Sequence, residues 1–290
     1  MELRQLAYFV AVVEEASFTR AAARVHVAQP GVSAQIRLLE REFGHALLDR
    51  SGRAVRLTAV GETVLPYARA ALAAVEGARL AVDELAGLVR GHVAIGMVAS
   101  HDVDVPALLA SFHADCPAVE ITLAEANSGQ LIDDLRTGRL DAAIIGVAED
   151  PPGLQISVLS AERLVVGVGL DDPLAATSSI PVDDLAGRPL ICLPVGTGIR
   201  AILENACAAA GFRPHVAFEA GTPQVLADLA ARGLGTAVLP ATIVGNRPDL
   251  HPIEVTGAEL RGRLVLGWRA DTAGSPAARA FVLHALRTLV

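Results

Sequence analysis

The chain has 290 residues, of which 52% are hydrophobic and 19% are charged. This length predicts about two domains, and the composition is typical of globular rather than disordered chains. The longest stretch without a charged residue, residues 233–246, is shorter than the roughly 18 residues that span a bilayer. The first fifteen residues include four charged ones and lack the apolar core of a secretory signal. We therefore expect a cytoplasmic protein without a membrane segment.

The basic and sulfur-containing residues exclude several classes of chemistry. All 24 basic residues are arginine, so Schiff-base catalysis and a Walker-type phosphate site, which both need lysine, are excluded. Cys116, Cys192 and Cys207 are too scattered for a disulfide framework or a metal knuckle. Cys192 and Cys207 lie in apolar surroundings, which favours inert buried thiols over redox sensing. His101 and Asp104 have no further ligands at metal-binding spacing, so we expect no metal site and no cofactor.

The formal charge of −8 is divided unevenly along the chain. Residues 1–57 carry eight arginines and six acidic residues, a net charge of +2. Residues 91–290 carry 13 arginines and 22 acidic residues, a net charge of −9. This asymmetry is typical of a small nucleic-acid-binding head attached to an acidic body.

Apolar spacing in the first 45 residues predicts three helices. The first ends near Glu15, and Ser17 is the predicted N-cap of a short second helix over residues 18–26. Gln29 and Pro30 open the third helix, because proline is favoured in a first helical turn. The predicted buried stripe of the third helix consists of Val32, Ile36, Leu39 and Phe43. This order is the helix-turn-helix plan, in which the third helix presents its N-terminal residues to the major groove of DNA.

A two-stranded hairpin is predicted after the third helix. Residues 47–57 favour two short strands that turn at Ser51 and Gly52. Arg50 and Arg53 flank the tip, where an arginine can enter a narrow minor groove or hold a phosphate. Residues 1–58 therefore form a predicted winged helix-turn-helix domain.

Short motifs in this head, taken in order, carry a family resemblance. They are residues 6–9, 17–22, 27–30, Ser33, 35–36, 39–40, 57–58 and 61–62. Together they resemble the LysR-type transcriptional regulators. Two positions depart from the family pattern: Ala34 stands where a basic or polar residue is usual, and Ala59-Val60 stand where Pro-Ala is usual.

The helix-turn-helix plan and the resemblance together predict the residues that contact double-stranded DNA. They lie at the start of the second helix, along the outer N-terminal half of the third helix and on the hairpin. The predicted contacts are Thr19, Arg20, Gln29, Pro30, Ser33, Arg37, Arg50 and Arg53.

Residues 59–90 predict one long linker helix, N-capped by Thr58 and interrupted only by Pro66. Its apolar positions alternate spacings of four and three, as in a heptad seam: Val64, Ala68, Ala71, Val75, Ala78 and Val82. Such a seam favours the packing of two helices, and the resemblance implies an antiparallel dimer at this helix. We expect a homodimer or homotetramer whose heads read an inverted-repeat operator.

Residues 91–290 alternate strands with helices, which predicts an α/β effector-binding domain of two lobes. Predicted crossovers near Ala161 and Trp268 place residues 91–161 and 268–290 in lobe I and residues 162–267 in lobe II. This two-lobed plan resembles the periplasmic binding proteins and the effector domain of the same family.

Short polar residues follow the predicted strands of both lobes, where helix N-termini offer free N–H groups to a ligand. They are Ser100, His101, Asn127, Ser128, Gly196, Thr197, Gly198, Glu219 and Thr222. We expect them to face one cleft that binds a small organic anion.

These observations predict a transcriptional regulator, not an enzyme, with DNA, a second copy of itself, the anion and RNA polymerase as partners. Two alternatives remain open. A solute-binding protein with an unrelated helical extension would show no salt-dependent affinity for DNA. A small-metabolite enzyme would use the same cleft with His101 as the base, although no GxSxG, HExxH or GxGxxG framework occurs in a supporting context.

Overall fold

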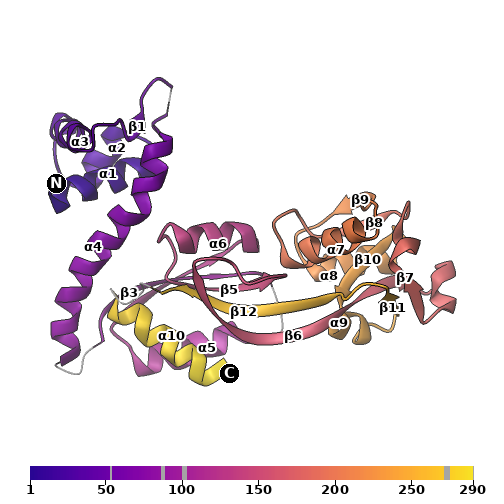
Figure 1. Cartoon of the computed structure of the whole chain (residues 1–290). Coiled ribbons are helices and arrows are strands. Elements are labelled where there is room, and N and C mark those ends of the chain that lie inside the picture. The colour runs from indigo at the N-terminus through magenta and orange to yellow at the C-terminus, as the bar shows by residue number, and fades with distance from the viewer. Residues whose placement is uncertain (53, 86–88, 100–102, 271–274, 290) are drawn as a thin grey trace.

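The computed structural model describes all residues except 53, 86–88, 100–102, 271–274 and 290. A helical head, a long helix and a body of two α/β lobes follow one another along the chain (Figure 1). This is the architecture predicted from the sequence. No helix in the described part of the chain is long and apolar enough to cross a membrane.

The head consists of α1 (Leu3–Glu15), α2 (Phe18–Arg24) and α3 (Gln29–Phe43), followed by β1 (Leu48–Asp49) and β2 (Arg56–Leu57). The predicted cap is confirmed, since the Ser17 hydroxyl accepts a hydrogen bond from the Arg20 N–H. The predicted hairpin is confirmed by the antiparallel pairing of Leu48 with Leu57. Helix α2 ends earlier than predicted, because His26 adopts a φ of 55° that a helix does not allow.

The core of the head forms where α1, α2 and α3 meet. Val32, Ile36 and Leu39 of α3 are fully buried, as predicted, so the opposite face of α3 is directed outward. The prediction for Phe43 was wrong, because its side chain is 38% exposed. Phe43 is the last residue of α3 and extends past the other helices of the core.

Helix α4 (Ala59–Leu85) begins where predicted, because the Thr58 hydroxyl accepts a hydrogen bond from the Gly61 N–H. Gly61 brings this helix against the hairpin, since a Cβ at this position would collide with the carbonyl oxygen of Leu47. Leu65 and Ala68 then pack into the core of the head. The first turns of α4 are therefore part of the head as well as of the linker.

Lobe I is built on the parallel strands β3 (Gly91–Met97), β4 (Val119–Glu125) and β5 (Ala142–Val147), with β3 in the centre. Helices α5 (Val105–Asp115) and α10 (Pro276–Leu289) cover one face of this sheet, and α6 (Ser128–Arg136) covers the other (Figure 1).

Lobe II surrounds β10 (Thr236–Pro240), which pairs with β8 (Leu190–Cys192); β8 in turn pairs with β9 (Val216–Glu219). The lobe also contains β7 (Ser179–Pro181), β11 (Leu250–Thr256) and two 3₁₀ turns, Pro173–Ala176 and Val182–Leu185. Its helices are α7 (Gly198–Ala209), α8 (Pro223–Ala231) and α9 (Ala241–Gly245).

Two long strands, β6 (Leu154–Gly169) and β12 (Arg261–Arg269), connect the lobes and pair antiparallel with each other. Strand β6 pairs with β10 of lobe II only from Leu164 onward, which is close to the predicted crossover near Ala161. The second crossover lies earlier than the predicted position near Trp268. Strand β12 pairs with β5 of lobe I from Arg263, so residues 263–267 belong to lobe I. The periodicity of this short apolar run could not show which sheet it joins.

Candidate functional site

The outer surface of α3 carries most of the predicted DNA contacts. Gln29, Pro30 and Arg37 are exposed, and Ser33 is half-buried at the same face. Arg37 makes no ion pair or side-chain hydrogen bond among the contacts found for the described residues. A guanidinium without an internal partner on an outward helix face can pair with a DNA phosphate at little cost.

Another predicted contact, Arg20, is already engaged within the head. Thr19 is exposed, but the guanidinium of Arg20 lies 3.5 Å from a Glu15 carboxylate oxygen and also donates to the Glu15 backbone carbonyl. The side chain of Arg20 is 66% exposed, so screened solvent weakens this pair. Arg20 can exchange it for a phosphate, whereas Arg53 lies outside the described residues.

Arg50 differs from the free arginine that the sequence predicted at the tip of the wing. Its guanidinium lies 2.6 Å from a Glu40 carboxylate oxygen and 5.1 Å from the centroid of the Phe18 ring. The other carboxylate oxygen of Glu40 accepts the backbone N–H of Leu47 and of Leu48. Arg50 therefore ties the hairpin to α2 and α3, and a DNA contact by Arg50, which stays a prediction, would have to compete with Glu40.

The turn of the wing is organised by Asp49. Its carboxylate accepts both the hydroxyl and the backbone N–H of Ser51, at 2.7 and 2.9 Å. The hydrogen bond from the Ser51 hydroxyl is the main reason why the pKa of Asp49 is lowered. This Asx turn fixes the start of the loop that carries the hairpin tip.

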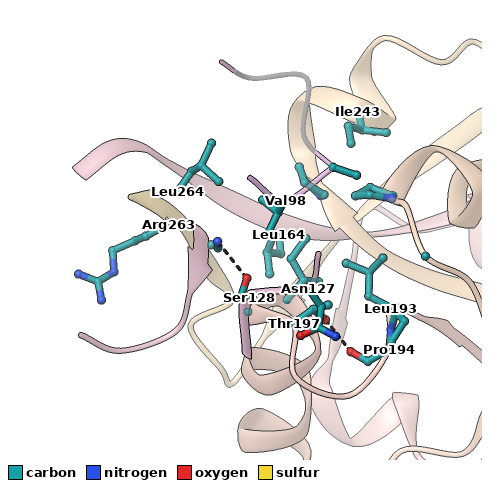
Figure 2. A pocket seen from close by; sticks show the side chains of 18 of the residues that line it. Val98, Asn127, Ser128, Leu164, Leu193, Pro194, Thr197, Ile243, Arg263 and Leu264 are labelled. Atoms are coloured by element: carbon teal, nitrogen blue, oxygen red, sulfur yellow. Dashed lines mark hydrogen bonds between the residues drawn. The ribbon is translucent and has the colours of Figure 1, made fainter. Parts of the chain in front are cut away.

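A cavity of about 430 Å³ lies between the two lobes (Figure 2). Its apolar wall includes Val98, Leu164, Leu193, Pro194, Ile243 and Leu264. Four of the predicted ligand-binding residues line it: Asn127 and Ser128 from lobe I, and Thr197 and Gly198 from lobe II. The structure thus brings together polar groups that are 69 or more residues apart in the sequence.

The polar side chains of this cavity also make hydrogen bonds within their own lobes. The Ser128 hydroxyl, on a residue only 3% exposed, accepts the Gly146 N–H at 3.1 Å. Asn127 caps α6 by accepting the Gln130 N–H. Thr197 does not cap α7, because its hydroxyl donates to the Pro194 carbonyl instead (Figure 2). Among the described residues, no side chain accepts from the backbone N–H groups in the first turn of α7, at the edge of the cavity.

Three predicted ligand-binding residues do not line the cavity. The Gly196 carbonyl accepts the Gly129 N–H at 2.8 Å, which joins the lobes beside it. Glu219 ends the exposed edge strand β9 and pairs with Arg200 at 3.7 Å. Thr222 caps α8 through the Val225 N–H. These placements were wrong because a short polar residue after a strand is as often a cap as a ligand contact. Ser100 and His101 lie outside the described residues.

Sequence reasoning missed three charged residues among those described at the cavity: Glu125 at the end of β4, Glu162 and Arg263. Glu162 accepts the hydroxyl and the N–H of Thr242, at 2.8 and 3.3 Å. The Arg263 guanidinium lies 2.8 Å from a carboxylate oxygen of Asp150. Glu162 and Arg263 stand on the crossing strands β6 and β12, and only the register of that pair shows that they face a shared space.

The predicted dimerisation seam on α4 divides into two parts. Ala68 is only 2% exposed because it packs into the core of its own head, so its assignment to a dimer contact was wrong. Val64 and Ala71 also pack against that core. Val75 and Ala78 are exposed and remain available to a partner helix. The side chain of Val82 lies outside what the structure describes.

The cysteines are poor nucleophiles. Cys192 and Cys207 are buried, as predicted, and Cys116 is half-buried. Burial raises the pKa of the Cys192 thiol to about 11, so almost none of it is thiolate at neutral pH. In the described part of the chain, no group of three His, Cys, Asp or Glu side chains is arranged to hold a metal ion.

A winged helix-turn-helix head with an outward α3, joined by a long helix to a two-lobed body with a polar-lined cavity, defines an effector-controlled DNA-binding regulator. Comparison with known proteins specifies the class. Residues 3–62 match the family described as bacterial regulatory helix-turn-helix protein, lysR family, and residues 86–289 match the LysR substrate binding domain. The chain belongs to the LysR family of transcriptional regulators.

Individual relatives match this chain over nearly its whole length. The uncharacterized HTH-type transcriptional regulator YnfL of Escherichia coli is 32% identical over 296 residues, covering 100% of this chain and 99% of that protein. The HTH-type transcriptional regulator AlsR of Bacillus subtilis is 33% identical over 280 residues, covering 93% and 91%. A full-length OxyR variant from Pseudomonas aeruginosa has a similar structure, with a TM-score of 0.73, 28% identity and coverage of 100% and 99%. The chain is a DNA-binding transcriptional regulator with an effector-binding domain.

Proposed function

We propose that the protein binds an inverted-repeat operator as a homodimer or homotetramer. In each head Gln29, Pro30 and Ser33 read base edges, while Arg20, Arg37 and Thr19 hold phosphates. The observation that carries this proposal is the outward N-terminal face of α3, whose opposite stripe is fully buried. The exposed Val75 and Ala78 of α4 support pairing of two linker helices beyond the head.

The effector in this proposal is a small organic acid with an apolar body and a single negative group. The largely apolar wall of the cavity supports the apolar body. The uncapped first turn of α7 favours a carboxylate at that end, where the Thr197 hydroxyl can turn from the Pro194 carbonyl to donate to the ligand. Glu125 and Glu162 also line the cavity, and Arg263, the guanidinium found among its described lining residues, is paired with Asp150. This balance of charge disfavours a second carboxylate on the ligand.

The protein acts in the cytoplasm and contacts RNA polymerase at the promoter, without catalysing a reaction itself. Its membership of a family of transcriptional regulators supports this part of the proposal. A regulator of this kind needs only different effector affinities for two arrangements of its lobes.

Calorimetric titration tests the ligand class, with benzoate as the monocarboxylate probe and succinate as the dicarboxylate probe. We expect benzoate to bind more tightly than succinate, and Thr197→Ala to weaken benzoate binding about fivefold or more. Thr288→Ala, on the far helix α10, is the matched control and should leave the affinity unchanged. Tighter succinate binding, or full affinity in Thr197→Ala, would contradict the proposed ligand class.

A further inference from the structure

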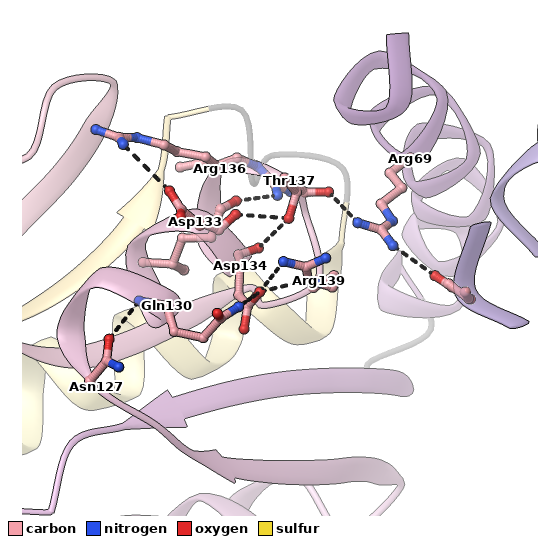
Figure 3. A network of polar contacts seen from close by, with 11 residues as sticks. Arg69, Asn127, Gln130, Asp133, Asp134, Arg136, Thr137 and Arg139 are labelled. Carbon is pink, nitrogen blue, oxygen red and sulfur yellow. Dashed lines mark hydrogen bonds and ion pairs between the residues drawn. The ribbon is translucent and has the colours of Figure 1, made fainter. Parts of the chain in front are cut away.

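Arg69 is a buried charge that contacts the head and the body at once (Figure 3). Its side chain is 9% exposed. One guanidinium nitrogen donates to a carboxylate oxygen of Glu14 on α1, and another donates to the carbonyl oxygen of Thr137 at the end of α6, both at 3.0 Å. A single side chain of α4 thus joins the DNA-binding head to lobe I.

Both partners of Arg69 are themselves fixed. The second carboxylate oxygen of Glu14 accepts a hydrogen bond from Arg24 of α2, at 2.7 Å. The N–H and the hydroxyl of Thr137 both donate to the Asp133 carbonyl, at 2.9 and 2.8 Å. The Thr137 carbonyl therefore has a set position at the negative end of the α6 dipole, where a guanidinium is favoured.

The environment of Arg69 makes this bridge sensitive to small displacements. Burial lowers the pKa of Arg69, and its hydrogen bond to Glu14 opposes that effect. When a buried charge loses one of its partners, its desolvation is no longer compensated and the protein is destabilised. The guanidinium is therefore stable in two situations, bridged to both partners or released into solvent, and unstable between them.

Helix α6 connects this bridge to the interlobe cavity. Its N-cap Asn127 and first residue Ser128 line the cavity, and its C-cap Thr137 contacts Arg69. The helix has nine residues, a length of about 13 Å at 1.5 Å per residue. A helix of this length moves as a rigid unit, so a displacement at the cavity reaches the Thr137 carbonyl.

We propose that Arg69 is a latch that holds the head in one orientation on lobe I, and that a shift of α6 opens it. The latch is a property of the single protomer and does not depend on which ligand the cavity takes. An experiment that refutes the latch would therefore leave the proposed ligand class standing, and one that refutes the ligand class would leave the latch standing.

Pulsed electron paramagnetic resonance on the full chain tests the latch. Spin labels at Ala23→Cys in the head and Ala114→Cys in lobe I, both at exposed positions, report the distance between them. The half-buried Cys116 is replaced by serine, and excess unlabelled protein restricts the signal to distances within one protomer. We expect a single narrow distance distribution in the labelled parent.

Arg69→Gln should broaden this distribution or add a second distance, since glutamine carries no charge and cannot reach both partners. Arg163→Gln is the matched control, because it removes an exposed ion pair with Glu254 of β11, which contacts neither the head nor α6 in the part of the chain that the structure describes. If Arg69→Gln fails to fold, Glu14→Gln removes the charge of the partner in the head, and the same distance distribution is measured. A narrow distribution in both latch variants would overturn the proposal.

The role of α6 is tested at the opposite end of the helix. A Cβ at Gly129 would lie 3.3 Å from the Gly196 carbonyl oxygen, so Gly129→Val pushes the start of α6 away from lobe II. We expect this variant to populate a second distance. Gly146→Ala is the control, because its Cβ would meet only the Ser128 hydroxyl at 3.7 Å. An unchanged distribution in Gly129→Val would overturn the transmission through α6.

Discussion

The guanidinium of Arg50 lies 2.6 Å from the carboxylate of Glu40, which joins the base of the wing to the recognition helix α3. Glu40 is 13% exposed and also accepts two backbone N–H groups of the strand before the turn. The position of the wing relative to α3 is therefore set by one partly buried carboxylate, and the two DNA-facing elements are held as a unit.

Glu40→Ala should destabilise the head. It leaves the Leu47 and Leu48 N–H groups and the Arg50 guanidinium without their acceptor, at a cost of about 1–3 kcal/mol. Urea unfolding followed by circular dichroism measures this loss. Glu42→Ala, which removes a 52% exposed carboxylate, is the control and should change stability by less than about 0.5 kcal/mol. Equal stability of the two variants would show that the Glu40 contacts contribute little.

Arg37→Ala should weaken DNA binding by removing a phosphate contact. The slope of log affinity against log salt should then fall by about one. Fluorescence anisotropy on the intergenic DNA beside the gene, at several salt concentrations, measures this slope. Arg163→Ala removes an equally exposed charge from the body, and its slope should match that of the unmodified protein. An unchanged slope in Arg37→Ala would place this residue off the DNA.

Gly198→Ala should separate the two lobes. A Cβ at Gly198 would lie 2.5 Å from the Gly146 carbonyl oxygen of lobe I, and both partners are backbone groups that cannot rotate away. Such overpacking costs about 1–3 kcal/mol and should lower both the melting temperature and the affinity for benzoate. Gly221→Ala also lines the cavity, but its Cβ would meet nothing within 4 Å, so it should behave like the parent. If Gly198→Ala and Gly221→Ala had the same melting temperature and the same affinity for benzoate, the close contact between the lobes at Gly198 would be disproved.

The buried thiol of Cys192 should make the protein less stable at alkaline pH. Burial raises its pKa from an ordinary value of 9.0 to about 11, so between these values the unfolded chain loses a proton that the folded chain keeps. Stability therefore falls as pH rises through this window, by roughly 2–3 kcal/mol at most. Cys192→Ala should flatten the fall, which urea unfolding at pH 8 and pH 10.5 can measure. The same slope in both proteins would show that other groups cause the decline.

The local elements of this protein could be predicted from the sequence because their signals lie within one or two helical turns. Ser17 and Thr58 cap helices through residues three positions away, and the buried stripe of α3 repeats at helical spacing. Four of the residues predicted to bind the effector line the cavity, since they lie at strand ends and helix starts.

The long-range contacts could not be predicted in this way. Arg69 appears in the sequence as one more charged residue of a long helix, and only the fold brings it between Glu14 and Thr137. Ala68 fits a heptad seam and the core of the head equally well, because an alanine has no feature that separates the two. Glu162 faces the cavity only because β6 pairs with β12 in one register.

The most direct test of the account is the affinity of the double variant Gln29→Ala, Ser33→Ala for its operator. Anisotropy titrations should compare the intergenic DNA beside the gene with a scrambled duplex of the same length and composition. We predict that the double variant binds both duplexes with the weak affinity of the parent for scrambled DNA, because its phosphate contacts remain while its base contacts are lost. Full preference for the intergenic DNA in the double variant would contradict the assignment of α3 as the element that reads sequence.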